Sequence, residues 1–195
     1  MIDARIDVSL RGLDRLIAAA GPRANTGIAR ALNRAGSPTA NAEIREVKKI
    51  LGLRNHPRAK TSLGDAVKRK TSKRRATSAR LEYSLSGWGD GFSLIYYQPK
   101  ETPQGATVNR LGARKLVARS FYLSGKFPRR RTSSISHVVW QRVGKGRWNL
   151  KRPKGPGVPE AMVQPSAKAT WQTGAAQRLP AALAKELGAI LAGYA

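Results

Sequence analysis

The residues that could perform acid–base, nucleophilic or metal chemistry are few and scattered in this sequence. His56 and His137 are far apart in the chain, and neither has an acidic residue nearby. A Ser/His/Asp arrangement or a histidine-rich metal site needs such side chains to be brought together. Glu43 and Glu46 share a predicted helical face with Arg45 close by, which is typical of surface ion pairs and not of a general acid and base.

The distribution of the acids also argues against a hydrolytic nuclease. The sequence has 11 Asp and Glu residues, and none lies between Thr102 and Pro159. Two-metal nucleases draw on several acids around one centre. The glycine pairs at 144–146 and 155–157 match neither of the phosphate-cradling patterns, GxxxxGK[ST] and GxGxxG. We therefore expect a protein that is not an enzyme and has no cofactor and no metal.

Charge is the strongest feature of the composition. The sequence has 37 Lys and Arg residues against 11 acids, a formal net charge of +26. Self-repulsion of this size opposes compaction unless a polyanion or an acidic neighbour relieves it. Nucleic acid is the first candidate partner, because cations that neutralise phosphates bind without reading sequence. Acidic protein surfaces and anionic lipid are the alternatives.

The compartment is indicated by what the sequence lacks. It has no cysteine, which suits a cytosolic protein and is also compatible with other compartments. Its first ten residues, MIDARIDVSL, have no apolar core of signal-peptide length. No stretch approaches the roughly 20 apolar residues of a membrane span. We expect a soluble protein without a membrane partner.

The run from His137 to Pro156 carries the clearest local pattern. Val138, Val139 and Trp140 favour a strand, and the glycines around Lys145 can supply a tight reversal. We predict a β-hairpin whose tryptophans pack in the sheet and whose cations have no acid nearby in the sequence.

The N-terminal part has helical periodicity. We expect a short strand at 4–10, a helix with an apolar stripe from Leu13 to Ala20, and one long, kinked helical arm from about 22 to 51. Gly36-Ser37-Pro38 predicts an interruption, because Ser37 is a good N-cap and Pro38 suits the first helical position. The small residues of the arm allow close approach to a neighbouring element.

The segment from Arg54 to Arg80 is strongly basic, with Asp65 as its one acid. It fits a helix from Ser62 to about Arg75. A mobile basic arm that orders on binding fits equally well, because little apolar surface packs it down.

The second half predicts an antiparallel sheet. Alternation at 80–85 and the apolar run at 92–97 favour a hairpin, 98–112 a loop, and 117–123 a further strand. Residues 127–136 predict a basic loop and 155–165 an extended connection. A final helix follows over 175–192, with Pro180 near its first turn.

The predicted fold class is α+β, with N-terminal helices and a C-terminal helix packed on an antiparallel β-sheet and with long basic loops or arms. The length suits one domain. Within it we distinguish a strand and helical arm (1–53), a basic segment (54–80), the sheet (81–154), and a linker with the C-terminal helix (155–195).

Four segments occur in an order that resembles the minor tail protein Z family of long-tailed phages, also called tail-completion proteins. They are GIARALNRAG (27–36), KRKTSKRRATSARLEYS (68–84), RSFYLSGK (119–126) and VVWQRVGKGRW with KGPGVPEAM (138–162). The last block is the most specific.

The resemblance implies a structural virion protein of the neck, needed to complete the head-proximal end of a siphovirus tail. It would form a ring, most simply sixfold, that joins the tail tube or terminator to the head connector or stopper and contacts the genome end. Its place would be the virion, and the host cytoplasm during assembly. The alternatives are a free, non-sequence-specific nucleic-acid-binding protein, for example a packaging or ribosome-associated factor, and an adaptor whose charge meets acidic ring proteins.

The candidate contact residues are the cations of three basic loops. They would touch DNA phosphates without reading bases, or the acidic surface of a partner protein. They are Lys68, Arg69, Lys70, Lys73, Arg74, Arg75, Arg129, Arg130, Arg131, Arg142, Lys145, Arg147, Lys151, Arg152 and Lys154.

Overall fold

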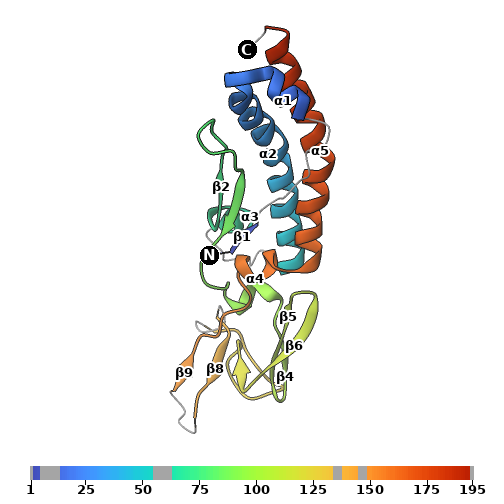
Figure 1. Ribbon diagram of the computed structural model, residues 1–195. Coiled ribbons are helices and arrows are strands. Elements are labelled where there is room, and N and C mark those ends of the chain that lie inside the picture. The colour runs from blue at the N-terminus through green and yellow to red at the C-terminus, as the bar shows by residue number, and fades with distance from the viewer. Residues whose placement is uncertain (1, 5–13, 55–62, 134–137, 145–148, 194–195) are drawn as a thin grey trace. The chain divides into compact units, whose positions relative to one another are not determined.

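The computed structural model describes residues 2–4, 14–54, 63–133, 138–144 and 149–193, and within these the side chains of 2–4, 14–16 and 63 are left aside. The fold is α+β, as predicted, with two long helices and three small antiparallel sheets (Figure 1). The chain divides into two compact units. Unit 1 comprises residues 1–46, 71–87 and 162–195, and unit 2 comprises 47–70 and 88–161. The single domain expected from the length stays a prediction.

The helices of unit 1 follow the predicted periodicity with two corrections. α1 (Asp14–Ala20) ends in a 3₁₀ turn at Gly21–Arg23, and α2 (Ala24–Leu51) follows. The predicted interruption at Ser37 is wrong, because α2 continues through Pro38. α5 (Pro165–Leu191) begins ten residues before the predicted start at 175, so Pro180 lies inside it. A proline removes one helical hydrogen bond, and tertiary packing of both helices outweighs that loss here.

The core of unit 1 lies between α2 and α5, which run side by side (Figure 1). One cluster joins Ala31 and Ala35 to Leu179, Ala182 and Leu183. A second cluster joins Ala20 and Ala24 to Leu187 and Ile190. These are the apolar stripes seen in the sequence, and the small residues of α2 do allow a close approach, in this case to α5.

Two glycines of α2 lie at close contacts, one with α5 and one with the ring of Tyr83. A Cβ on Gly27 would lie 2.6 Å from Cδ1 of Ile190, and a Cβ on Gly36 would lie 2.5 Å from Cγ of the Tyr83 ring. Tyr83 is buried and its ring centroid lies 6.5 Å from that of Trp171 on α5. The glycines of the GIARALNRAG segment therefore serve helix and ring packing.

The sheet of unit 1 has the order β1-β3-β2, all antiparallel, with β1 at Ile2–Ala4, β2 at Thr71–Arg74 and β3 at Ser84–Gly87. The predicted helix at 62–75 is wrong beyond Arg69, because α3 (Leu63–Arg69) ends there and β2 follows. The predicted strand at 4–10 falls mainly outside the described residues. The Asn33 side chain exchanges two hydrogen bonds of 2.9 Å with the backbone of Ala76, which fixes the β2–β3 connection on α2.

Unit 2 contains a three-stranded antiparallel sheet in a region where the sequence predicted mainly a loop. β4 (Lys100–Thr102), β5 (Gly105–Arg110) and β6 (Ala113–Ala118) form a meander over residues 100–118, so the loop predicted at 98–112 is wrong. These strands were not predicted because the segment is polar and contains prolines, which are typical of loops. Val108 and Ala106 are fully buried, and β6 is exposed except at Val117.

The predicted hairpin within 137–156 is confirmed. β8 (Trp140–Arg142) pairs with β9 (Leu150–Lys151) on one side and with β7 (Ser120–Phe121) on the other, all antiparallel. Gly144 has φ +72°, so it supplies the positive φ expected of the turn. Trp140 is only half-buried, and Trp148 lies outside the described residues.

The apolar run at 92–97 does not pair with residues 80–85 as predicted. Leu94–Tyr97 is a 3₁₀ helix, and Phe92 exchanges backbone hydrogen bonds with Gly155 and Pro156 instead. Gly155 packs against the Tyr97 ring, and a Cβ on Gly155 would lie 2.3 Å from Cε2 of that ring. The Tyr97 hydroxyl donates a hydrogen bond to the Pro156 carbonyl.

The connection at 155–165 is not wholly extended. It contains α4 (Val158–Met162), where Glu160 accepts a hydrogen bond from the Gly157 N–H at the start of the helix. Among the described residues, no helix is both long enough and apolar enough to cross a membrane.

Candidate polyanion interface

The basic strand β2 carries the predicted cations of unit 1. Lys73 donates a hydrogen bond of 2.5 Å to Oδ1 of Asn41 on α2, while Arg74 and Arg75 are exposed. Residues 71–74 form β2, which pairs with β3, and Ala76 is hydrogen-bonded to Asn33 of α2. The alternative of an arm that is mobile until it binds stays a prediction. In the structure these cations lie on and just after an edge strand of the sheet.

The C-terminal end of α3 carries Lys68 and Arg69, both exposed, and Lys70 follows it. Lys68 lies 4.0 Å from the Asp65 carboxylate. The Lys70 ammonium donates to the Asp90 carbonyl and lies 4.5 Å from the centroid of the Phe92 ring. Lys70 thus has a structural role within unit 2.

Lys154 has an acidic partner that is distant in sequence. Its ammonium lies 2.5 Å from Oδ2 of Asp90, and this hydrogen bond and the lysine's charge lower the pKa of Asp90. The interpretation that the hairpin cations have no acid nearby is wrong for this residue. The pair is exposed, so it adds little to stability but reduces the net charge at this point.

The sheet β7-β8-β9 puts aromatic rings and arginines on one face. Phe121 is opposite Trp140, and Arg142 is opposite Leu150. Residues that are opposite each other, or two apart on a strand, share a face. The Arg142 guanidinium carbon lies 5.1 Å from the Phe121 ring centroid, and that of Arg152 lies 4.4 Å from the Trp140 ring. Lys151 is exposed and, because it follows Leu150 on β9, belongs to the opposite face of the sheet.

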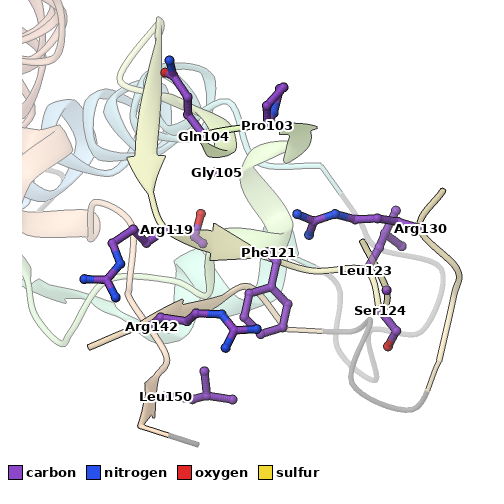
Figure 2. A pocket seen from close by; sticks show the side chains of 12 residues that line it. Pro103, Gln104, Gly105, Arg119, Phe121, Leu123, Ser124, Arg130, Arg142 and Leu150 are labelled. Carbon is purple, nitrogen blue, oxygen red and sulfur yellow. The ribbon is translucent and has the colours of Figure 1, made fainter. Parts of the chain in front are cut away.

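Next to this face lies a pocket of about 550 Å³, which we call the arginine pocket. Figure 2 shows Phe121 between Arg142 on one side and Arg130 on the other. The lining residues that matter for charge are Arg119, Arg130 and Arg142, and none of the lining residues is acidic.

A buried carboxylate holds the wall of the arginine pocket in place. Oε1 of Glu101 accepts hydrogen bonds from the N–H groups of Tyr122 (2.7 Å) and Leu123 (2.9 Å), and Oε2 forms an ion pair with Arg130. The side chains of Glu101 and Arg130 are 7% and 15% exposed. Burial, and next the charge of Glu101, raise the pKa of Tyr122.

The structure brings together only part of the predicted set. Arg130 and Arg142 line one pocket, and Arg152 is on the sheet face beside it. Arg129 and Arg131 are exposed on the neighbouring loop, and Lys145 and Arg147 lie outside the described residues. The cations of β2 belong to unit 1.

Two pocket residues were missed from the sequence. Arg119 connects β6 to β7 and has φ +58°, and Phe121 provides the ring under Arg142. The available signal was the RSFYLSGK segment, which was noted for its resemblance but not for its charge.

Candidate metal ligands are not clustered in the described part of the chain. No group of three or more His, Asp or Glu residues there is placed to hold a metal ion. Both histidines lie outside the described residues. Comparison with protein-family models, with curated proteins and with solved structures finds no match.

Proposed function

We propose that this protein is a structural component of the head-proximal end of a phage tail, where it forms a sixfold ring and contacts a polyanion. The polyanion is the DNA backbone, and the neighbouring proteins are the tail terminator, the tail tube and the connector or stopper. The excess of positive charge carries the proposal. If each of the 11 acids paired with one of the 37 Lys and Arg residues, 26 cations would still be unpaired.

The arrangement of these cations supports contact without sequence reading. They project from β2, from the end of α3 and from the β7-β8-β9 face, and are not gathered on one recognition helix. Contacts spread over several elements suit phosphates, which position a nucleic acid but carry no base information. The place in the tail rests on the order of the four segments described above.

A salt titration tests the contact. The affinity of the purified chain for a short DNA duplex should fall with salt, with a slope of about −0.9 per phosphate contacted. Replacing Lys151 and Arg152 with glutamine should reduce that slope by about 1 to 2. The control replaces Lys115 and Lys168, two exposed lysines outside the candidate set, and should leave the slope unchanged. Equal effects of the two double variants would contradict the proposed contact.

The place in the tail needs a separate test. The chain should be detected by mass spectrometry in purified, DNA-filled particles, and electron cryomicroscopy should locate it as a ring at the neck. A protein that binds DNA in the salt titration but is absent from the particles would instead be a free nucleic-acid-binding protein.

A further inference from the structure

We propose that the arginine pocket is a receptor for a phosphomonoester, a phosphate group at the end of a chain or on a small molecule. This goes beyond the proposed function, because contact with a duplex backbone needs only an exposed basic surface. The pocket is instead concave, and its volume of about 550 Å³ lies within the range of roughly 300–1,000 Å³ that is usual for small-molecule sites.

Contacts within the protein already position the guanidinium of Arg142 at the pocket. Its guanidinium carbon lies 5.1 Å from the Phe121 ring centroid, within cation–π range, so the ring helps to position this group at the pocket. The N–H groups lie in the plane of the guanidinium and point outward from its edges, where their fork matches two phosphate oxygens. Figure 2 shows this guanidinium beside the ring, at the pocket that Arg130 enters from the other side.

The second wall is also fixed in advance. Arg130 is held by Glu101, and Glu101 is itself held by two backbone N–H groups of the loop that follows Phe121. Because the loop and its arginine are already ordered, a bound anion would not have to offset the entropy of ordering them. The same pair also sets the charge of the pocket.

That charge matches a doubly charged phosphate. Three arginines line the pocket and one carboxylate, that of Glu101, pairs with Arg130, so the local formal charge is three minus one, or +2. A phosphomonoester carries about −1.5 to −2 at neutral pH. A backbone phosphodiester or a carboxylate carries a single negative charge. The pocket therefore favours the terminal group.

The backbone of Arg119 is strained, and strained residues often occur at functional sites. Its φ of +58° places a residue with a Cβ in the left-handed region, which is a strained conformation for any residue but glycine. In that conformation its N–H donates to the Gln104 carbonyl (2.9 Å) and its carbonyl accepts from the Arg142 N–H (3.1 Å). The strained residue thus joins the chain segment before β5 to the strand that carries Arg142.

Calorimetric titration of the full chain tests the proposal with three probes at about 0.15 M ionic strength, where exposed charges are screened beyond about 8 Å. The probes are inorganic phosphate, a short single-stranded oligonucleotide with a 5′-phosphate, and the same oligonucleotide without it. We expect the phosphorylated oligonucleotide to bind at least tenfold more tightly than the other. Measurable binding of inorganic phosphate alone would identify the phosphate group as sufficient, and its failure to bind would place part of the site on the attached nucleotide.

Two variants locate the binding. R142Q should remove most of the preference for the 5′-phosphate, whereas K115Q, which removes one charge from exposed β6 outside the pocket, should preserve it. A thermal unfolding midpoint equal to that of the wild type shows that each variant is folded. Equal affinity for the two oligonucleotides, or the same loss in R142Q and K115Q, would overturn the proposal. The duplex titration described above does not depend on this preference, so each proposal can fail without the other.

Discussion

Glu43 provides the sharpest test of the packing between the two long helices. Its side chain is buried at 1% exposure, and its Oε2 has no hydrogen-bond partner among the described residues, so the surface ion pair predicted from the sequence is wrong for Glu43. Thr39, one turn earlier on α2, faces Gly174 of α5. Because α2 and α5 run antiparallel, Glu43 lies at the level of Trp171, whose indole N–H is also buried without a partner among the described residues. Burial raises the pKa of Glu43 to about 7.

Replacing Glu43 with glutamine keeps the shape of the side chain and removes its ionisation. Below pH 4.5 the wild-type carboxyl is protonated in both the folded and the unfolded chain, so it carries no charge penalty. Between pH 4.5 and about 7 the folded chain holds a proton that the unfolded chain releases, so the free energy of unfolding falls as pH rises. The difference between the two pKa values corresponds to about 3 kcal/mol, all of it lost above pH 7.

Urea unfolding followed by far-ultraviolet circular dichroism measures this difference. E43Q should match the wild type at about pH 4 and exceed its stability by up to about 3 kcal/mol at about pH 8.5. The exposed acid Glu82 provides the control, because E82Q makes the same charge change where no burial penalty exists, and should stay within about 0.5 kcal/mol of the wild type. An E43Q advantage that does not change with pH, or a variant that is less stable at about pH 8.5, would refute the assignment of a buried, unpaired carboxyl.

Three further substitutions are measured by the same unfolding assay. Gly36→Ala places a methyl group against the Tyr83 ring and should cost about 1–3 kcal/mol, because the ring must move out of a packed core. Gly188→Ala is the matched control, since a Cβ there meets nothing within 4 Å, and it should stabilise α5 by about 0.5–1 kcal/mol; equal effects would contradict the packing argument. Tyr97→Phe removes the hydroxyl of a buried side chain that donates a hydrogen bond to the Pro156 carbonyl, and should cost about 1 kcal/mol or more. An unchanged stability would show that this hydrogen bond does not hold residues 155–157 in place.

The helical half of the fold could be predicted because its signal is local. Ile28, Ala31 and Leu32 repeat at helical spacing, as do Leu179 and Leu183, and these residues form or flank one core cluster. The continuous course of α2 through Pro38 could not be predicted in this way. The energy that tolerates the proline comes from contacts with a helix more than a hundred residues later in the chain.

The sheets were harder to predict because their strands are short and partly exposed. β6 buries Val117 and exposes its other side chains, so it has no alternating apolar pattern to detect. The run at 92–97 is apolar enough to predict a strand, but the backbone partners of Phe92 are Gly155 and Pro156, which the sequence assigned to an extended connection. A Cβ on Gly91 would lie 1.6 Å from the Gly155 carbonyl oxygen, so this crossing depends on two glycines whose contact is visible only in three dimensions.

The charge pairs of the candidate interface also could not be predicted, because they join residues that are distant in sequence. The block from Thr102 to Pro159 lacks acids in sequence, yet Glu101 pairs with Arg130 and Asp90 pairs with Lys154. Two of the predicted contact residues are therefore partly neutralised, one as a buried support and one at the surface. Both acids precede this block in sequence and contact it at single positions. At the arginine pocket, the Glu101 carboxylate holds Arg130 and the loop after Phe121 in place, and the pocket still has an excess of positive charge. Functional substitutions should accordingly start at Arg142, whose removal changes the charge of the pocket without breaking the pair that holds its wall.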